Sequence, residues 1–174
     1  VEIAMRNLKE ANLLDVDSLH GASVGRIEEE VRPTGFYRQK SKSVKNFVEF
    51  LTEEYQGDME KMCTEDAQSL REKLLSVKGI GYETADSILL YACDKPFVVV
   101  DAYTKRALGR LEMIDTDNYE RMRTFFEDSL PRDLDLYKEF HALLVELGKR
   151  FCRTNPICQD CPLNDICPHP SKTE

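Results

Sequence analysis

Apolar residues recur every three or four positions along most of this chain, which is the spacing of amphipathic helices that face a core. The clearest such stretches are residues 1–14, 44–51, 67–77, 85–92 and 137–151. One apolar run, Phe97-Val98-Val99-Val100, is too short for a helix and rich in β-branched residues, so we expect an extended connector there. The pattern predicts an all-α fold.

The connector also suggests where the chain divides. A chain of 174 residues can bury one sizeable core or two small ones. We expect two helical lobes, residues 1–95 and residues 96–174. Val1 is not an initiating methionine and the first helix has no cap, so we expect a truncated N-terminus. Thr64, followed by Glu65 and Asp66, is expected to cap the helix at 67–77.

A tight turn, Gly79-Ile80-Gly81, separates two of the helical stretches. The glycines allow a sharp bend and a close approach by another molecule, while Ile80 fills the gap between the helices. The second helix then starts with unpaired N–H groups, which bind anions. This is the pattern of a helix-hairpin-helix that holds a DNA phosphate, but an ordinary αα-hairpin would look the same.

Asp101 lies where the extended connector ends and the next helical pattern begins. Aspartate is among the best residues for starting a helix, so an N-cap is its simplest role. An N-cap carboxylate is held in place and kept ionised by amide donors and the helix dipole. The same residue can therefore start a helix and supply a fixed negative charge for catalysis.

Together, the hairpin and Asp101 resemble the endonuclease III superfamily of DNA glycosylases, whose pattern is G-[IV]-G-x-x-T-A followed by V-D-x-x-x-x-R. The matching residues are Gly79, Gly81, Thr84, Ala85, Val100, Asp101 and Arg106. The resemblance implies a base-excision-repair glycosylase with Asp101 as its catalytic carboxylate. It also implies that the partner is double-stranded DNA with a damaged base, and that the DNA-binding residues are Lys78, Gly79, Ile80, Gly81, Thr84, Lys105 and Arg106.

Glu83 occupies the position where bifunctional members of this family carry a lysine that forms a Schiff base. A glutamate cannot form that adduct, so the resemblance implies a monofunctional hydrolase with weak or absent AP-lyase activity. The form G-I-G-x-E-[ST]-A-D is similar to the 3-methyladenine branch. Two carboxylates, Glu83 and Asp101, would favour a cationic base such as 3-methyladenine or 7-methylguanine. Glu83 fits equally well as a first-turn residue favoured by the helix dipole.

Two other functions remain open at this point. The protein could remove oxidised or mispaired bases, as endonuclease III-like members do, or it could be a non-catalytic helix-hairpin-helix module that only binds DNA. The net charge of −8 does not favour nucleic-acid binding, but residues 71–110 contain seven basic and five acidic side chains, whereas residues 111–135 contain three and eight. The acid is therefore concentrated away from the hairpin.

Four of the six cysteines fall within sixteen residues, in the spacing C-x5-C-x2-C-x5-C. Disulfides are disfavoured because nothing indicates secretion. A zinc site is possible, but structural zinc sites usually use two C-x2-C pairs and this chain has one. A [4Fe-4S] cluster suits a compact loop of this kind. The family's loop, C-x6-C-x2-C-x5-C, differs by one residue in its first gap. We therefore expect a loop at 152–167 that holds the cluster through Cys152, Cys158, Cys161 and Cys167.

Some candidate residues fit structural roles better than functional ones. Lys40, Lys42 and Lys45 fit a solvated helix start better than a phosphate site. His141 lies beside an apolar stripe and fits a hydrogen-bonded structural residue better than a ligand. No apolar run reaches the length of a membrane span. We therefore expect a soluble protein in the cytoplasm, where it would associate with the nucleoid. We also expect a monomer.

Overall fold

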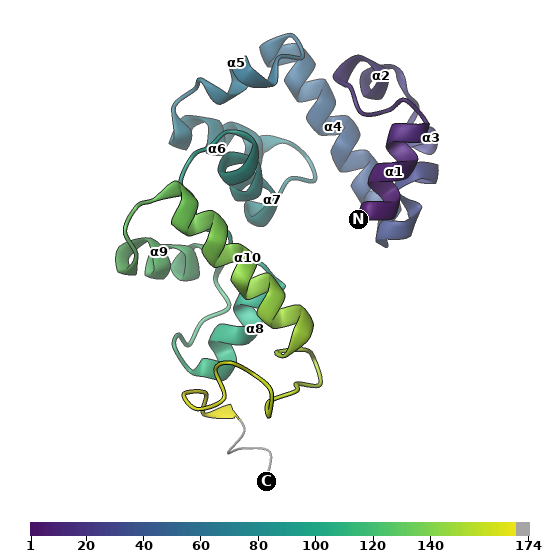
Figure 1. Cartoon of the computed structure of the whole chain (residues 1–174). Coiled ribbons are helices and arrows are strands. Elements are labelled where there is room, and N and C mark those ends of the chain that lie inside the picture. The colour runs from purple at the N-terminus through teal and green to yellow at the C-terminus, as the bar shows by residue number, and fades with distance from the viewer. Residues whose placement is uncertain (170–174) are drawn as a thin grey trace. The chain divides into compact units, whose positions relative to one another are not determined.

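The computed structural model describes residues 1–169, and these residues form helices joined by turns, with no strand among them (Figure 1). This confirms the all-α prediction. The chain divides into two compact units, the first comprising Val1–Ala85 and the second starting at Asp86. The sequence pattern instead predicts a division between residues 95 and 96. Each unit has its own buried side chains, and each is described below by itself.

The first unit contains short helices around one long one. Its elements are α1 (Glu2–Glu10), α2 (Val16–Gly21), α3 (Val24–Val31), the 3₁₀ turn η1 (Arg32–Thr34), α4 (Tyr37–Tyr55), α5 (Met59–Cys63), α6 (Ala67–Ser76) and the start of α7 (Tyr82–Ser87). The second unit continues α7 as the π-helical turn η2 and adds three helices. These elements are η2 (Ile88–Ala92), α8 (Ala102–Leu111), α9 (Tyr119–Ser129) and α10 (Leu134–Arg150). None of the helices within residues 1–169 combines the length and apolar character that crossing a bilayer requires.

Short polar side chains start most of these helices. Asp66 caps α6, because its Oδ1 accepts hydrogen bonds from the amides of Gln68 and Ser69, both at 3.0 Å. The sequence placed this cap at Thr64, which instead ends α5. The error has a simple physical reason: both residues can cap a helix, but aspartate is the stronger cap and lies next to the first helical residue.

The apolar run that precedes Asp101 forms the centre of the second unit's core. Phe97, Val98, Val99 and Val100 are buried and non-helical, which confirms the prediction of a connector outside the helices. Side chains from every surrounding element pack against this run. They include Leu90 of η2, Leu108 of α8, Tyr119, Met122 and Phe126 of α9, and Tyr137 of α10.

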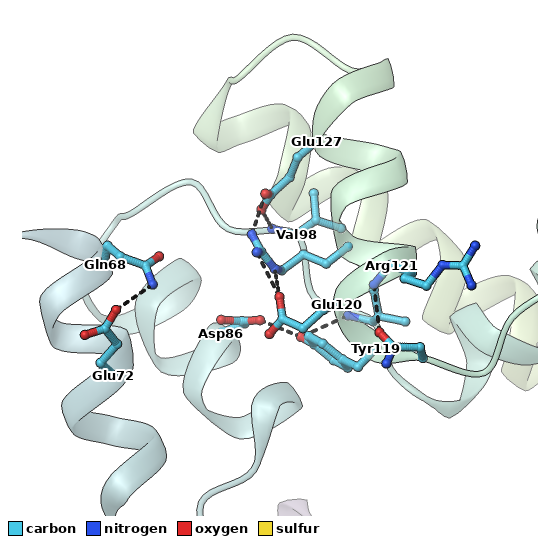
Figure 2. A network of polar contacts seen from close by, with 11 residues as sticks. Gln68, Glu72, Asp86, Val98, Tyr119, Glu120, Arg121 and Glu127 are labelled. Carbon is cyan, nitrogen blue, oxygen red and sulfur yellow. Dashed lines mark hydrogen bonds and ion pairs between the residues drawn. The ribbon is translucent and has the colours of Figure 1, made fainter.

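Among the residues that the structure describes, no strand lies beside this buried run, so its amides find partners among side chains (Figure 2). The Val98 amide donates to Glu127 Oε1 at 3.2 Å, and the Val100 amide donates to the Tyr119 hydroxyl at 3.4 Å. Tyr119 in turn donates to Asp86 Oδ2 at 2.8 Å. Buried amides must be paired, and α9 therefore supplies the hydrogen bonds that an adjacent strand would otherwise make.

Helices α8 and α10 lie against each other in the second unit (Figure 1). Gly148 of α10 makes this close approach possible, because a Cβ atom there would lie 2.3 Å from Tyr103 Cδ1 of α8. The two helices carry Asp101 at the start of α8 and His141 within α10. Their packing therefore fixes the separation of these two side chains.

Candidate functional site

The turn at Lys78 to Gly81 is fastened to α4 within the first unit. Gly79 has a φ of +94°, and a Cβ atom there would lie 2.3 Å from Ser43 Oγ. Ser43 Oγ donates to the Gly79 carbonyl at 3.1 Å, and Asn46 Nδ2 donates to the Lys78 carbonyl at 2.6 Å. Only glycine fits at position 79, because both the backbone conformation and the neighbouring serine exclude a side chain.

Ile80 and Gly81 differ in what the fold requires of them. Ile80 is only 7% exposed, as expected for a residue that fills the gap between α6 and α7. Gly81 is exposed, does not adopt a positive φ, and has no atom within 4 Å of where its Cβ would lie. No contact within residues 1–169 therefore requires glycine at 81, whereas an external molecule that approaches the turn closely would.

A groove of about 610 Å³ lies beside this turn, between it and α4. Its lining contains three lysines and no acidic residue: Phe36, Gln39, Lys40, Lys42, Ser43, Asn46, Lys78 and Gly79. Lys40 Nζ donates to the Thr34 carbonyl at 2.9 Å, while Lys42 and Lys78 are exposed. The sequence favoured a solvated helix start over a phosphate contact for Lys40 and Lys42, and the structure places both beside Lys78 in one basic groove. Glu83 and Thr84 are exposed in the first turn of α7.

In the second unit, Asp101 is the N-cap of α8, as predicted. Its Oδ1 accepts two hydrogen bonds from Thr104, one from the amide at 2.7 Å and one from the hydroxyl at 2.9 Å. Thr104 is fully buried, and Asp101 is only 8% exposed. The cap therefore uses one carboxylate oxygen, while Oδ2 takes no part in starting the helix.

The other carboxylate oxygen faces His141 of α10. Its Oδ2 lies 3.7 Å from His141 Nε2, which is an ion-pair distance and too long for a hydrogen bond. The other ring nitrogen, Nδ1, lies 2.6 Å from the hydroxyl of Tyr91 in η2. Three side chains far apart in sequence thus form one row, Tyr91–His141–Asp101.

These surroundings set the charge of Asp101. Burial alone would raise the pKa of the Asp101 carboxyl, but the nearby His141 imidazole and the two Thr104 donors outweigh burial and hold that pKa below its ordinary value. The carboxylate is therefore ionised at neutral pH. Burial raises the pKa of the Tyr91 hydroxyl, so Tyr91 remains a neutral hydroxyl beside His141 Nδ1.

The two basic residues expected to bind DNA from α8 have internal partners. Lys105 Nζ donates to the Asp117 carbonyl at 3.4 Å, beside a cavity whose walls also include Glu112 and Asp115. The Arg106 guanidinium donates to the carbonyls of Cys152 at 2.6 Å and Gly148 at 3.4 Å. Arg106 therefore fastens the cysteine segment to α8.

The segment that follows α10 is non-helical from residue 151 to residue 168, as predicted from its prolines. The thiols of Cys152, Cys158, Cys161 and Cys167 are free and partly buried, so these four residues form no disulfides. All four line one cavity of about 30 Å³, which also has Arg110 in its wall. Arg110 Nη1 lies 3.2 Å from Cys152 Sγ, and Cys167 Sγ lies 3.7 Å from the Arg110 carbonyl.

The positions of the four thiols can be compared with the ligand geometry that a metal ion or a metal cluster requires. Within residues 1–169, no three His, Cys, Asp or Glu side chains converge closely enough to hold a single ion. A zinc site requires that all its ligands converge on one point. In a [4Fe-4S] cluster each thiolate binds a different corner, so the sulfurs surround a volume. Four free thiols that line one cavity are of the chemical type that binds such a cluster.

The structure therefore groups some of the predicted residues and separates others. Asp101 belongs to the second unit, whereas Glu83, Thr84 and the hairpin turn belong to the first. The sequence patterns did not predict that Thr104 and His141 lie beside Asp101, or that Tyr91 lies beside His141. The contact between Thr104 and Asp101 could have been predicted, because a side chain three residues after an N-cap meets the cap in the first turn of the helix. No local pattern pairs His141 with Tyr91 across fifty residues.

Comparison with known proteins identifies relatives in sequence and, separately, in fold. A family model described as "HhH-GPD superfamily base excision DNA repair protein" matches residues 1–132. A protein of Methanocaldococcus jannaschii whose name proposes a DNA repair glycosylase is 45% identical over 170 residues, which cover 96% of this chain and 77% of that protein. The endonuclease III of Thermotoga maritima is 31% identical over 138 residues, 79% of this chain, and the match spans 60% of the longer relative.

One solved structure is similar in both fold and sequence. It is the H. pylori 3-methyladenine DNA glycosylase (MagIII) bound to 1,N6-ethenoadenine. The two superpose with a TM-score of 0.72 at 29% identity, over 85% of this chain and 76% of the other.

Proposed function

Because this chain belongs to the HhH-GPD superfamily of base excision DNA repair proteins, we propose that it is a DNA N-glycosylase with Asp101 as its catalytic carboxylate. The observation that carries the proposal is the geometry of that side chain. One oxygen is used by the helix cap, and the other is left beside His141 on an ionised, mostly buried carboxylate. A purely structural cap would need neither the histidine nor the burial.

The proposed chemistry follows from this fixed charge. The glycosidic bond is unreachable inside a base stack, so the nucleotide must first leave the stack. As the bond breaks, positive charge develops on the sugar. Asp101 Oδ2 would lie beside that charge and orient the attacking water. A preorganised carboxylate stabilises the transition state because it does not have to reorganise when the charge appears.

The hairpin and its groove provide the proposed contact with DNA. Amides at the start of α7 would hold one phosphate, and Gly81 leaves room for it. Lys78 lines the adjoining groove together with Lys40 and Lys42, so the positive charge continues from the turn onto α4. Phosphate contacts of this kind fix the position of the duplex without reading its sequence. A duplex that contains one damaged base is therefore the proposed partner, bound by a monomer in the nucleoid.

Two features support alkylated purines as the substrate class. Glu83 replaces the lysine required for a covalent adduct, which favours hydrolysis without strand cleavage. The H. pylori glycosylase that shares this fold at 29% identity is named for 3-methyladenine. An alkylated purine already carries positive charge and leaves without strong acid assistance. We propose Glu83 as the second carboxylate that favours such a base.

The cysteine segment is proposed to hold a [4Fe-4S] cluster through Cys152, Cys158, Cys161 and Cys167. Support comes from their free thiols, their shared cavity and the similarity to endonuclease III sequences. When bound, the cluster would supply a structural cross-link for a segment that has no helix of its own. Arg106 and Arg110 would join the cross-linked segment to α8, whose first turn holds Asp101.

Single-turnover release from a duplex with one 7-methylguanine tests the catalytic proposal. We expect release by the wild type, and a loss of about a hundredfold to a thousandfold in Asp101→Asn. Asparagine still caps the helix, so folding and duplex affinity should stay close to wild type. Borohydride should trap no covalent adduct. Release of thymine glycol but not of methylated purines would contradict the substrate class, and binding without any release would indicate a non-catalytic module.

Gly81→Ala tests the hairpin as a phosphate site. We expect the free energy of unfolding to change by no more than about 1 kcal/mol, because the added methyl group meets no protein atom. Duplex affinity should fall about tenfold, or about 1.4 kcal/mol, because the methyl group blocks the phosphate. Gly21→Ala is the matched control, since Gly21 also has nothing within 4 Å. Equal affinity in both variants would exclude the hairpin from the DNA interface.

Metal analysis of protein purified without oxygen tests the cluster. We expect iron and acid-labile sulfide in equal amounts, together with a visible charge-transfer absorbance. Cys158→Ser should lose both the absorbance and part of the thermal stability, because the segment folds around its metal group. Stoichiometric zinc with no visible absorbance would contradict the assignment.

A further inference from the structure

A row of polar side chains leads from the surface of the second unit to the buried oxygen of Asp101. Tyr91 is 47% exposed, and its hydroxyl lies 2.6 Å from His141 Nδ1. The opposite nitrogen, His141 Nε2, lies 3.7 Å from Asp101 Oδ2. Both nitrogens of one imidazole are thus directed at defined partners on two other elements.

The nitrogen that faces Asp101 is unusual among the described residues. His141 Nε2 is buried, and within residues 1–169 it is the buried side-chain nitrogen or oxygen that lacks a hydrogen-bond partner. An unsatisfied buried polar atom costs free energy. A histidine that served only the fold would be expected to satisfy both of its nitrogens. This one instead holds a polar atom close to a carboxylate without bonding to it.

The hydrogen bond between Tyr91 and Nδ1 bears on whether His141 Nε2 carries a proton. If the Tyr91 hydroxyl donates to Nδ1, the neutral ring carries its proton on Nε2, and an N–H group faces the carboxylate. With the opposite polarity, a lone pair would face the negative charge and repel it. Burial raises the pKa of the Tyr91 hydroxyl, so the phenol is neutral. A Tyr91 hydroxyl that donates to Nδ1 would therefore select the tautomer in which His141 attracts Oδ2.

We propose that His141 is a positioning residue for Asp101, oriented by Tyr91, in the glycosylase reaction. The inference rests on the proposed function above. At 3.7 Å the N–H group fixes the direction of Oδ2 without a hydrogen bond that would disperse its charge. The full negative charge then remains available for the sugar. Thr104 restrains Oδ1 through two hydrogen bonds, so the carboxylate cannot rotate.

The test measures the single-turnover rate constant for 7-methylguanine release and the duplex affinity separately. We expect His141→Leu to slow release at least tenfold while duplex affinity stays within about twofold of wild type, because only the orientation of the reacting oxygen changes. His141→Gln retains an N–H donor and should recover most of the rate. His20→Leu, at an exposed histidine of α2, should match wild type.

Tyr91→Phe provides an independent arm. In the wild-type background it should slow release, because His141 loses its fixed tautomer. In the His141→Gln background it should have no further effect, since Tyr91 acts only through the imidazole. Should His141→Leu fail to fold, Tyr91→Phe alone decides, and release at the wild-type rate would overturn the proposal.

The possible failures are distinguishable. Wild-type protein that releases no base from any lesion duplex overturns the proposed function and this inference together. Release by the wild type that is unchanged in His141→Leu overturns the inference alone. A loss in His141→Leu that follows duplex affinity or thermal stability, and is not recovered by His141→Gln, assigns the histidine to the fold.

Discussion

The paired use of the two oxygens of Asp101 is the constraint on which the rest of the site depends. Oδ1 completes the first turn of α8 by accepting the amide and hydroxyl of Thr104. Oδ2 is thereby directed away from the cap and toward His141. Formation of the helix cap also fixes the direction of Oδ2, because rotating the carboxylate would break the cap. The fold keeps the same carboxylate ionised although it is mostly buried.

Three further elements of the second unit hold that carboxylate in place. The buried run at 97–100 brings the chain to Asp101, and α9 anchors this run through Tyr119 and Glu127 (Figure 2). Helix α10 supplies His141 and packs closely on α8 at Gly148. The acidic stretch that includes α9 is therefore more than a solvated surface. Its glutamate and tyrosine pair the buried amides of the segment that leads to Asp101, the proposed catalytic residue.

Features determined by neighbouring residues could be predicted from the sequence. The helical stretches, the hairpin turn, the Asp101 cap and the non-helical cysteine segment all follow from short-range patterns. Features that depend on tertiary contacts could not. The row from Tyr91 to His141 joins residues fifty apart, and Glu127 contacts Val98 across twenty-nine. Lys40 and Lys42 look solvated until α4 is placed beside the turn at Gly79. Arg106 matches a family motif, yet its guanidinium bonds to the cysteine segment.

The most direct test of this account is the pKa of Asp101 itself. It can be measured by carbon-detected NMR on protein with carboxyl-labelled aspartate, with Asp101→Asn used to assign the resonance. We predict a pKa below the ordinary 3.8, and an upward shift of that pKa in Thr104→Val, which removes one of the two donors to Oδ1. A pKa at or above 3.8, unaffected by Thr104→Val, would mean that the cap does not hold this carboxylate as an aimed negative charge.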